Sequence, residues 1–287
     1  MEKENAIQYD RFYEKFNARH LHFDELDSTQ LYCKRNMKMF IENGELKNDK
    51  NMIIVSCNSQ TNGIGTRDTK NKMDRVWVSE NGNVFVSIIN LWKIEHIEKI
   101  NCLSQACTVA ISKTLEDFHL LTQIKWINDV LVDYKKISGC LVNLCYLNGF
   151  PDLEKNYVCV IVGIGINVNL TGNNNILSNN YTSIKKQLEQ DFNASSLVPS
   201  VEQVIQKLIN HFFISINKLR DENFSYFLEY ITIRLLYKGE KVIIDQDNHQ
   251  IVGYLKGILH DGSIILLNDH NQIIYANTGH LSLYKES

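Results

Sequence analysis

The sequence predicts an α+β protein in which helices flank a mixed β-sheet and a small β-barrel follows at the C-terminus. Three observations predict this fold class. Long apolar runs at 52–57 and 157–170 are typical of strands that are buried on both faces. Residues 103–118 and 201–219 carry apolar side chains at helical spacing. From Gly239 onward, short strand patterns alternate with tight-turn sequences.

The first half of the chain is expected to supply the large sheet. The run "MIIVSC" at 52–57 precedes a long polar connection, and "GNVFVSIINLW" at 82–92 alternates as a strand does. A helix is expected at 103–118, because its apolar residues form one stripe. Further strands are expected at 123–126, 129–132, 138–147 and 157–170.

The second half begins with a helix whose start is well marked. Ser200 and Gln203 have the spacing of a capping box, which predicts a helix from 201 to about 219. Another helical pattern runs through 223–237. Beyond it we expect strands at 240–245, 250–259, 263–267, 272–276 and 279–284, with turns at 260–263 and 268–272. The expected division is an N-terminal extension at 1–20, a main domain at 21–236 and a small C-terminal domain at 237–287.

The composition limits the classes of partner. The chain has 287 residues, of which 44% are hydrophobic, so it can bury a sizeable core. A formal net charge of −3 supplies no bulk basic field for nucleic acid or an anionic membrane, and neither partner is expected. No apolar run reaches the roughly 18 residues that span a bilayer, and residues 1–15 lack the apolar core of a secretory signal. We expect a cytoplasmic protein, or an organellar one if a longer form carries a leader.

The seven cysteines form no CxxC pair, and most of them stand in apolar runs. This pattern predicts reduced, buried thiols in a reducing compartment. A cysteine nucleophile or a zinc site is the alternative.

Four segments place polar or glycine-rich residues beside apolar runs: "DSTQ" at 27–30, "QTNGIG" at 60–65, "KWINDVLVDYKKISGC" at 125–140 and "GIGIN" at 163–167. Each has a structural interpretation as well as a functional one. Ser28 or Thr29 would serve as a helix N-cap, and glycines at 163 and 165 would relieve crowding against a neighbouring helix.

Taken together, the four segments point to one kind of chemistry. Hydroxyl and amide groups at Ser28, Thr29 and Gln60 suit a small uncharged polar group such as a urea. Glycine-rich backbone suits phosphates. Two like charges about 4 Å apart repel by about 1 kcal/mol in water and about 4 kcal/mol at a partly buried site, so an enzyme that joins two anions needs fixed cations. Lys125 and Lys136 are the candidates.

The string Lys125-Trp126-Ile127-Asn128-Asp129, with Lys136 and Gly139 after it, resembles the KWPND…K..G pattern of the biotin–protein ligases. The other segments match that family in the same chain order. "DSTQ" looks like the family's DSTN, "QTNGIGTR" with "RVW" is similar to QTxGRGRxGRxW, and "GIGIN" is shared. The tail after Gly239 is similar to the family's SH3-like barrel, so the resemblance runs from about residue 21 to the end.

The resemblance implies a class II synthetase-like catalytic domain that makes biotinyl-adenylate from biotin and ATP with Mg²⁺. The biotinyl group then passes to one lysine on a biotin carboxyl carrier domain of a carboxylase, with acetyl-CoA carboxylase as the expected acceptor. A monomer or a homodimer is compatible with it.

The resemblance also assigns residues. The biotin-binding set is Ser28, Thr29, Gln30, Gln60, Gly63, Trp77, Lys136 and Gly139. The ATP-binding set is Gly65, Thr66, Arg67, Arg75, Lys125, Asn128 and Asn167. The catalytic set is Lys136, Lys125, Asp129 and Arg67, and Asp129 is the candidate magnesium ligand.

The glycine loop departs from the family pattern. Thr66 stands where an arginine is expected, Arg67 comes one place late, and seven further residues separate it from Arg75. We hypothesise that Arg67 partly replaces the missing arginine and that the longer loop retains the adenylate less tightly; the alternative is that Arg67 serves in full. A lipoate–protein ligase and a non-catalytic, biotin-responsive regulator are the rival functions.

Overall fold

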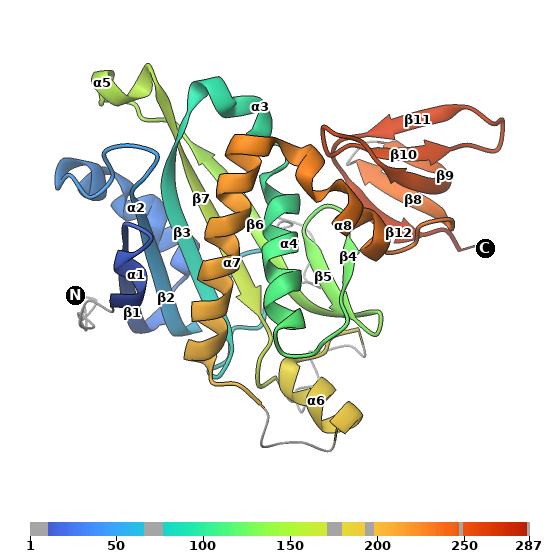
Figure 1. Ribbon diagram of the computed structural model, residues 1–287, viewed down its shortest axis with the longest axis horizontal. Coiled ribbons are helices and arrows are strands. Elements are labelled where there is room, and N and C mark those ends of the chain that lie inside the picture. The colour runs from blue at the N-terminus through green and yellow to red at the C-terminus, as the bar shows by residue number, and fades with distance from the viewer. Residues whose placement is uncertain (1–10, 66–76, 171–179, 193–197, 247–248, 286–287) are drawn as a thin grey trace.

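The computed structural model describes residues 11–65, 77–170, 180–192, 198–246 and 249–285 (Figure 1). Its main unit is a seven-stranded mixed sheet with the order β1-β2-β3-β7-β6-β5-β4. The strands are β1 Ala18–Leu26, β2 Met52–Gln60, β3 Val84–Lys93, β4 Gln123–Lys125, β5 Asp129–Val132, β6 Lys135–Cys145 and β7 Tyr157–Ile166. The strands predicted from the apolar runs are therefore confirmed, and β1 is an addition to them.

Only the first pair of strands in this sheet is parallel. β1 and β2 run in the same direction, joined through the helix α2, Thr29–Glu42, and every other neighbouring pair is antiparallel. β3 and β7 pair over ten residues each at the centre. Nine of the ten residues of β3 are buried, as expected for a strand covered on both faces.

Helices cover both faces of the sheet (Figure 1). α4, Leu103–Glu116, and α7, Val201–Glu222, pack against each other on one face, and α2 covers the other. Each face has its own apolar cluster, one under α4 and α7 and one under α2. The shorter helices are α1 Arg11–Glu14, η1 Ile94–His96, α3 Ile97–Ile100, α5 Pro151–Glu154, α6 Ile184–Phe192, η3 Phe224–Phe227 and α8 Leu228–Arg234.

The predicted helix starts are confirmed. Ser200 caps α7: its hydroxyl accepts from the Gln203 backbone N–H at 3.2 Å, and the Gln203 side chain accepts from the Ser200 N–H at 2.9 Å. These two bonds satisfy backbone donors that a helix start otherwise leaves unpaired. The helical pattern at 223–237 divides into η3 and α8.

The C-terminal unit is a five-stranded antiparallel sheet with the order β11-β10-β9-β8-β12. Its strands are β8 Lys241–Gln246, β9 His249–Ile258, β10 Ile264–Leu267, β11 Ile273–Ala276 and β12 His280–Leu283. All five predicted strands are present. β11 and β12 are the outer strands of this sheet, and no pairing between them closes it into a barrel within the described residues.

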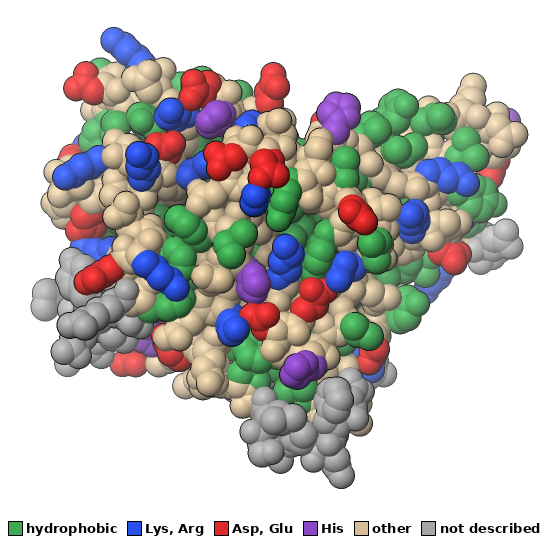
Figure 2. Space-filling view, viewed as in Figure 1, with side chains coloured by type: hydrophobic (Ala, Val, Ile, Leu, Met, Phe, Trp, Pro, Cys, Tyr) green, Lys and Arg blue, Asp and Glu red, His purple; other side chains and the backbone are tan. Residues whose placement is uncertain are grey.

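The N-terminal part of the described chain is integrated into the main sheet. Tyr13 and Phe16 are buried in the cluster under α4 and α7. The boundary expected at residue 20 falls inside β1, which pairs with β2 from Ala18 onward. None of the described helices is both long and apolar enough to cross a membrane. Basic and acidic side chains are interspersed on the face that Figure 2 shows.

The cysteines are free thiols, and six of them are buried while Cys145 is half-buried. Burial raises the pKa of Cys57 and of Cys102 to about 12, which disfavours the thiolate. The prediction of buried thiols is thus confirmed. Within the described residues, no group of three metal-ligating side chains stands together.

Candidate functional site

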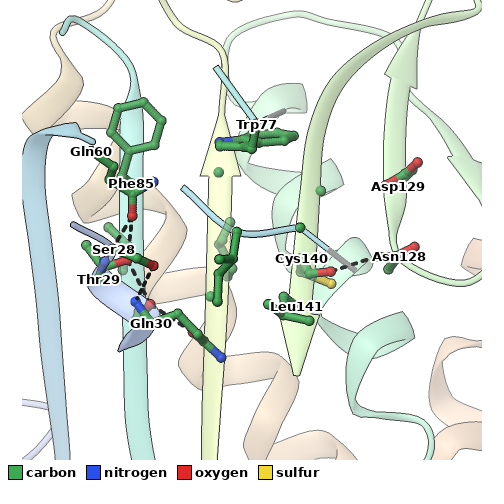
Figure 3. Close-up of a pocket in the computed structure, with 18 of the residues that line it drawn as sticks. Ser28, Thr29, Gln30, Gln60, Trp77, Phe85, Asn128, Asp129, Cys140 and Leu141 are labelled. Atoms are coloured by element: carbon green, nitrogen blue, oxygen red, sulfur yellow. Dashed lines mark hydrogen bonds between the residues drawn. The ribbon is translucent and has the colours of Figure 1, made fainter. Parts of the chain in front are cut away.

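A pocket opens on the face of the main sheet that α2 covers, beside the start of that helix (Figure 3). It encloses about 500 Å³, including the part that is open to solvent. Five strands (β2, β3, β5, β6 and β7), the start of α2 and neighbouring loop residues contribute to it, because the sheet order brings β3, β7 and β6 side by side. Its lining residues are Ser28, Thr29, Gln30, Gln60, Ile64, Gly65, Trp77, Phe85, Val86, Ser87, Asn128, Asp129, Lys136, Gly139, Cys140, Leu141, Gly163, Ile164 and Gly165.

A bulge in β6 places Lys136 in this pocket. Residues three apart in a regular strand point to opposite faces, so Lys136 and Gly139 would normally be separated by the sheet. The pairing of β5 with β6 shifts register here, and Ile137 has no partner on β5. Ile137 is buried in the cluster under α4 and α7, on the other face. The extra residue therefore brings Lys136 and Gly139 to the same face.

Lys136 forms an ion pair across the pocket wall. Its Nζ lies 2.7 Å from Asp129 Oδ1 and 5.3 Å from the centre of the Trp77 ring. The Lys136 side chain is 25% exposed and the Asp129 side chain 17% exposed, so water screens the pair only in part. A Cβ at Gly139 would stand 3.1 Å from both Lys136 Nζ and Asp129 Oδ1. Any side chain at position 139 would crowd the Lys136 ammonium and the Asp129 carboxylate, so glycine is needed there.

The opposite side of the pocket carries uncharged polar groups (Figure 3). Ser28 is the N-cap of α2, and its hydroxyl accepts from the Gln30 N–H at 3.2 Å, so the N-cap interpretation is confirmed. The Thr29 N–H donates to Gln60 Oε1 at 2.9 Å. Gln60 Nε2 in turn donates to Ser79 Oγ at 2.9 Å. These contacts hold the start of α2 against the end of β2.

The Trp77 indole covers the floor of the pocket, which two glycines of β7 form. A Cβ on Gly165 would stand 2.7 Å from Trp77 Cε2 and 2.9 Å from Nε1, so the ring lies directly on the strand backbone. A Cβ on Gly163 would stand 2.6 Å from Gln30 Oε1. Gly163 is thus crowded by a side chain of the neighbouring helix α2, as the structural interpretation expects, whereas Gly165 is crowded by the Trp77 ring.

The segment from Trp126 to Asp129 connects the pocket with the C-terminal sheet. Trp126 is buried in the C-terminal apolar cluster, and its Nε1 donates to Gly262 O at 3.0 Å. Gln105 of α4 donates to the same carbonyl at 2.8 Å. Two residues after Trp126, the Asn128 side chain donates to Cys140 O at 2.8 Å, which holds it against β6. The peptide between Trp126 and Ile127 is cis.

Most of the residues assigned by resemblance gather in this pocket, but six do not belong to its described lining. Lys125 lies in β4 and is half-buried. Asn167 is 5% exposed, and its amide donates to Thr182 O at 2.9 Å. Gly63 packs against Ser79 and Gln60. Three more assigned residues lie outside the described part of the chain: Thr66, Arg67 and Arg75.

Sequence reasoning missed several lining residues. Ser87 is fully buried, and its hydroxyl hydrogen-bonds to both Gln30 and Thr29. Behind the lining, Ser79 links Gln60 to the Trp77 carbonyl. A polar serine in the middle of the apolar strand 84–92 is a signal that could have identified Ser87. Nothing in the local pattern distinguishes Phe85, Cys140 or Leu141 from ordinary core residues.

Part of the chain matches one family model and two curated relatives. Residues 34–167 match the model of the Biotin/lipoate A/B protein ligase family. The chain is 36% identical over 119 residues to the bifunctional ligase/repressor BirA of Bacillus subtilis (strain 168), a match that covers 40% of this chain and 32% of that protein. BirA of Bacillus spizizenii is 35% identical over the same length. The chain thus spans about a third of the length of the curated relatives it matches.

Solved structures share the fold over nearly the whole chain. The biotin protein ligase from Aquifex aeolicus in complex with biotin and ATP has a TM-score of 0.70 at 24% identity, covering 93% of this chain and 99% of that one. The biotin protein ligase from Leishmania major in complex with biotinyl-5-AMP has a TM-score of 0.53 at 19% identity, covering 91% and 98%. At these identities the likeness concerns the fold. The family model and the curated relatives thus support the resemblance that the sequence motifs indicate, over part of the chain.

Proposed function

We propose that this chain is a biotin–protein ligase, which activates biotin with ATP and transfers it to a lysine of a carrier protein. In the first step a biotin carboxylate oxygen attacks the α-phosphorus of ATP. A phosphorus–oxygen bond breaks, and biotinyl-5′-AMP and pyrophosphate form. In the second step a neutral lysine amine of the carrier attacks the acyl carbon. An amide forms, AMP leaves, and the amine gives up a proton.

A single observation carries this proposal. One pocket presents uncharged hydrogen-bonding groups at Ser28, Thr29 and Gln60 on one side and the Lys136–Asp129 ion pair on the other. A molecule with a urea ring at one end and a carboxylate at the other fits this arrangement of chemistry. The buried polar groups would pair with the ring, and unpaired polar groups would penalise a ligand that lacks it.

Lys136 has the central role in the proposed first step. Its ammonium group is held at the pocket wall by Asp129 at 2.7 Å. Two anions, the carboxylate and the α-phosphate, must approach each other, and a fixed cation between them lowers their repulsion. Lys136 would contact the developing charge on these oxygens, in the manner of a preorganised electrostatic group. No covalent bond to the protein is required, and positioning supplies the rest.

Asp129 is the residue that would hold a magnesium ion. It is a carboxylate in the pocket, and magnesium is usually bound through one or two carboxylates together with substrate phosphates. The Asp129 carboxylate lines the pocket and its side chain is 17% exposed, which fits such a shared site. The ion would supply neutralisation of phosphate charge. Asn128, held by Cys140 O, lies on the same side of the pocket.

The proposed acceptor is a biotin carboxyl carrier domain, and acetyl-CoA carboxylase is the expected source of that domain. The acceptor lysine needs only access to the mixed anhydride, so the protein must present the adenylate at the open side of the pocket. This part of the proposal depends on the family relationship and on the chemistry of the second step.

The test is incubation of the purified protein with biotin, MgATP and a carrier domain, followed by intact-mass measurement and a pyrophosphate assay. We expect one biotinyl group per carrier and pyrophosphate release that requires biotin. The same reaction with lipoate tests the rival ligase, and labelling by lipoate but not biotin would reject the proposal. Biotin binding without pyrophosphate release would instead favour a non-catalytic regulator.

A further inference from the structure

The polar side of the pocket contains two amides whose orientation is fixed by the backbone. Gln30 Nε2 donates to Ile161 O at 3.1 Å and to Asn143 Oδ1 at 2.9 Å. A carbonyl oxygen can only accept, so the nitrogen of Gln30 must face Ile161 and its oxygen must face the other way. Gln30 Oε1 then accepts from the Ser87 hydroxyl at 2.9 Å. Both N–H groups of the Gln30 amide are thereby used inside the protein.

The second amide is fixed in the same way. The backbone N–H of Thr29 needs an acceptor, and Gln60 Oε1 stands 2.9 Å from it. The nitrogen of Gln60 therefore faces Ser79 Oγ, at 2.9 Å. The Ser79 hydroxyl donates a hydrogen bond to Trp77 O at 3.1 Å. The two amides leave little freedom to the hydroxyl groups between them.

The direction of the hydrogen bond between Thr29 and Ser87 follows from the number of hydrogens that the two hydroxyls can donate. Ser87 and Thr29 lie with their hydroxyl oxygens 2.8 Å apart, and each hydroxyl has one hydrogen. The hydrogen of Ser87 is committed to Gln30 Oε1, which cannot donate. In the bond between the two hydroxyls, Thr29 is therefore the donor and Ser87 the acceptor. The alternative acceptor for Thr29, Gln60 Oε1 at 3.3 Å, also lies within the protein. In either case the Thr29 oxygen presents only lone pairs to the pocket.

We propose that Ser87 is a positioning residue that, held by Gln30, commits the Thr29 hydroxyl as a hydrogen-bond acceptor and so selects a ligand ring that presents an N–H there. This inference rests on the proposed function, because Thr29 lines the biotin side of the pocket. A cyclic urea offers an N–H to such an oxygen. A ring with oxygen or sulfur at that place offers only lone pairs and would leave two acceptors facing each other.

The burial of the network makes the selection effective. Thr29 and Gln30 are each 4% exposed, and Ser87 is fully buried. Water therefore cannot readily supply the missing hydrogen bond to a wrong ligand. A site built to hydrogen-bond a substrate N–H can reject the analogue that lacks it strongly, for this reason.

The test compares the dissociation constants of biotin and of its two cyclic carbamate analogues, in which one or the other ring N–H is replaced by oxygen, by calorimetry. For the wild type, one of the two carbamates should bind at least about tenfold more weakly than biotin. In Ser87→Ala the Thr29 proton loses its nearest acceptor, and only the longer contact to Gln60 Oε1, at 3.3 Å, still competes with the ligand for it. The dissociation constant of the weaker-binding carbamate, divided by that of biotin, should then fall at least about fivefold. Gln30→Met frees the Ser87 proton for Thr29 and should lower the ratio in the same direction.

Ser56→Ala is the matched control. Ser56 is a fully buried serine on neighbouring β2, and its hydroxyl is hydrogen-bonded to His20 at 2.7 Å and to His22 at 2.9 Å, outside the pocket. This variant should lose stability without changing the ratio. If Ser87→Ala does not fold, Gln30→Met alone decides.

The outcomes separate the inference from the proposed function. A ratio that stays at its wild-type value in the variants, or a wild type that binds biotin and both carbamates equally, would overturn the inference and leave the ligase proposal standing. A wild type that binds none of these ligands would overturn both. An equal weakening of all ligands in Ser87→Ala would show that Ser87 only supports the structure.

Discussion

Replacement of Gly165 by alanine tests the floor of the pocket directly. The new Cβ would stand 2.7 Å from Trp77 Cε2 and 2.9 Å from Nε1, whereas carbon atoms in contact prefer about 3.5–4.0 Å. The indole must therefore move by about 1 Å, and a displacement of this size in a substrate-positioning group can cost about 10²-fold in rate. We expect kcat/KM for biotin-dependent pyrophosphate release to fall about 10²-fold in Gly165→Ala.

Two further variants show whether the ring is the cause. Gly257→Ala in the C-terminal sheet is the control, since a Cβ at that glycine would meet nothing within 4 Å. Addition of Gly165→Ala to a Trp77→Ala background should cost little more than Trp77→Ala by itself, because no ring remains to be displaced. Activity of Gly165→Ala within threefold of wild type, or fully additive losses in the double variant, would refute the reasoning.

Three other predictions concern charge and backbone. Lys136→Ala should lower the adenylation rate by about 10²–10³-fold with the fold intact by circular dichroism, because one preorganised donor is lost. Gly262→Ala should destabilise the protein by about 1–3 kcal/mol in urea unfolding, since φ is +83° and the Cβ would stand 2.7 Å from Gln105 Oε1. The hydrogen bond from Arg35 holds the pKa of Asp27 below its usual value of 3.8. The Arg35–Asp27 interaction therefore stabilises the fold fully above pH 3.8, and this stabilisation is lost as the pH falls through the lowered pKa. The difference in free energy of unfolding between wild type and Arg35→Ala should therefore vanish in acid.

The sequence predicts the sheet well because its central strands are long and continuously apolar. β3 and β7 are apolar along nearly their whole length. The start of α7 is marked by the capping box of Ser200 and Gln203. β1 was missed because His20, His22 and charged residues alternate with Leu21 and Phe23, and the pattern was not recognised as a half-buried strand. Local periodicity was present there and could have been used.

The site was only partly predictable, and the reasons are physical. Lys136 and Gly139 share a face only because Ile137 bulges out of register, which depends on how β5 pairs with β6. The motif resemblance identified both residues, whereas period-2 reasoning would separate them. Ser87 became a candidate only when the fold placed it 2.8 Å from Thr29, 58 residues earlier in the chain. A serine inside an apolar strand marks Ser87 as unusual, but nothing local in the sequence identifies Thr29 as its partner.

The position of Trp126 has a consequence for attempts to recombine this protein with its relatives. Its indole belongs to the C-terminal cluster, while Asn128 and Asp129, two and three residues later, face the pocket. A chimera that exchanges the C-terminal sheet alone would pair a foreign turn with this tryptophan in place of the Gly262 carbonyl. Successful grafts should therefore transfer Trp126, the turn that contains Gly262, and Gln105 together. Grafts that separate them should lose the proposed pyrophosphate release while the protein still folds.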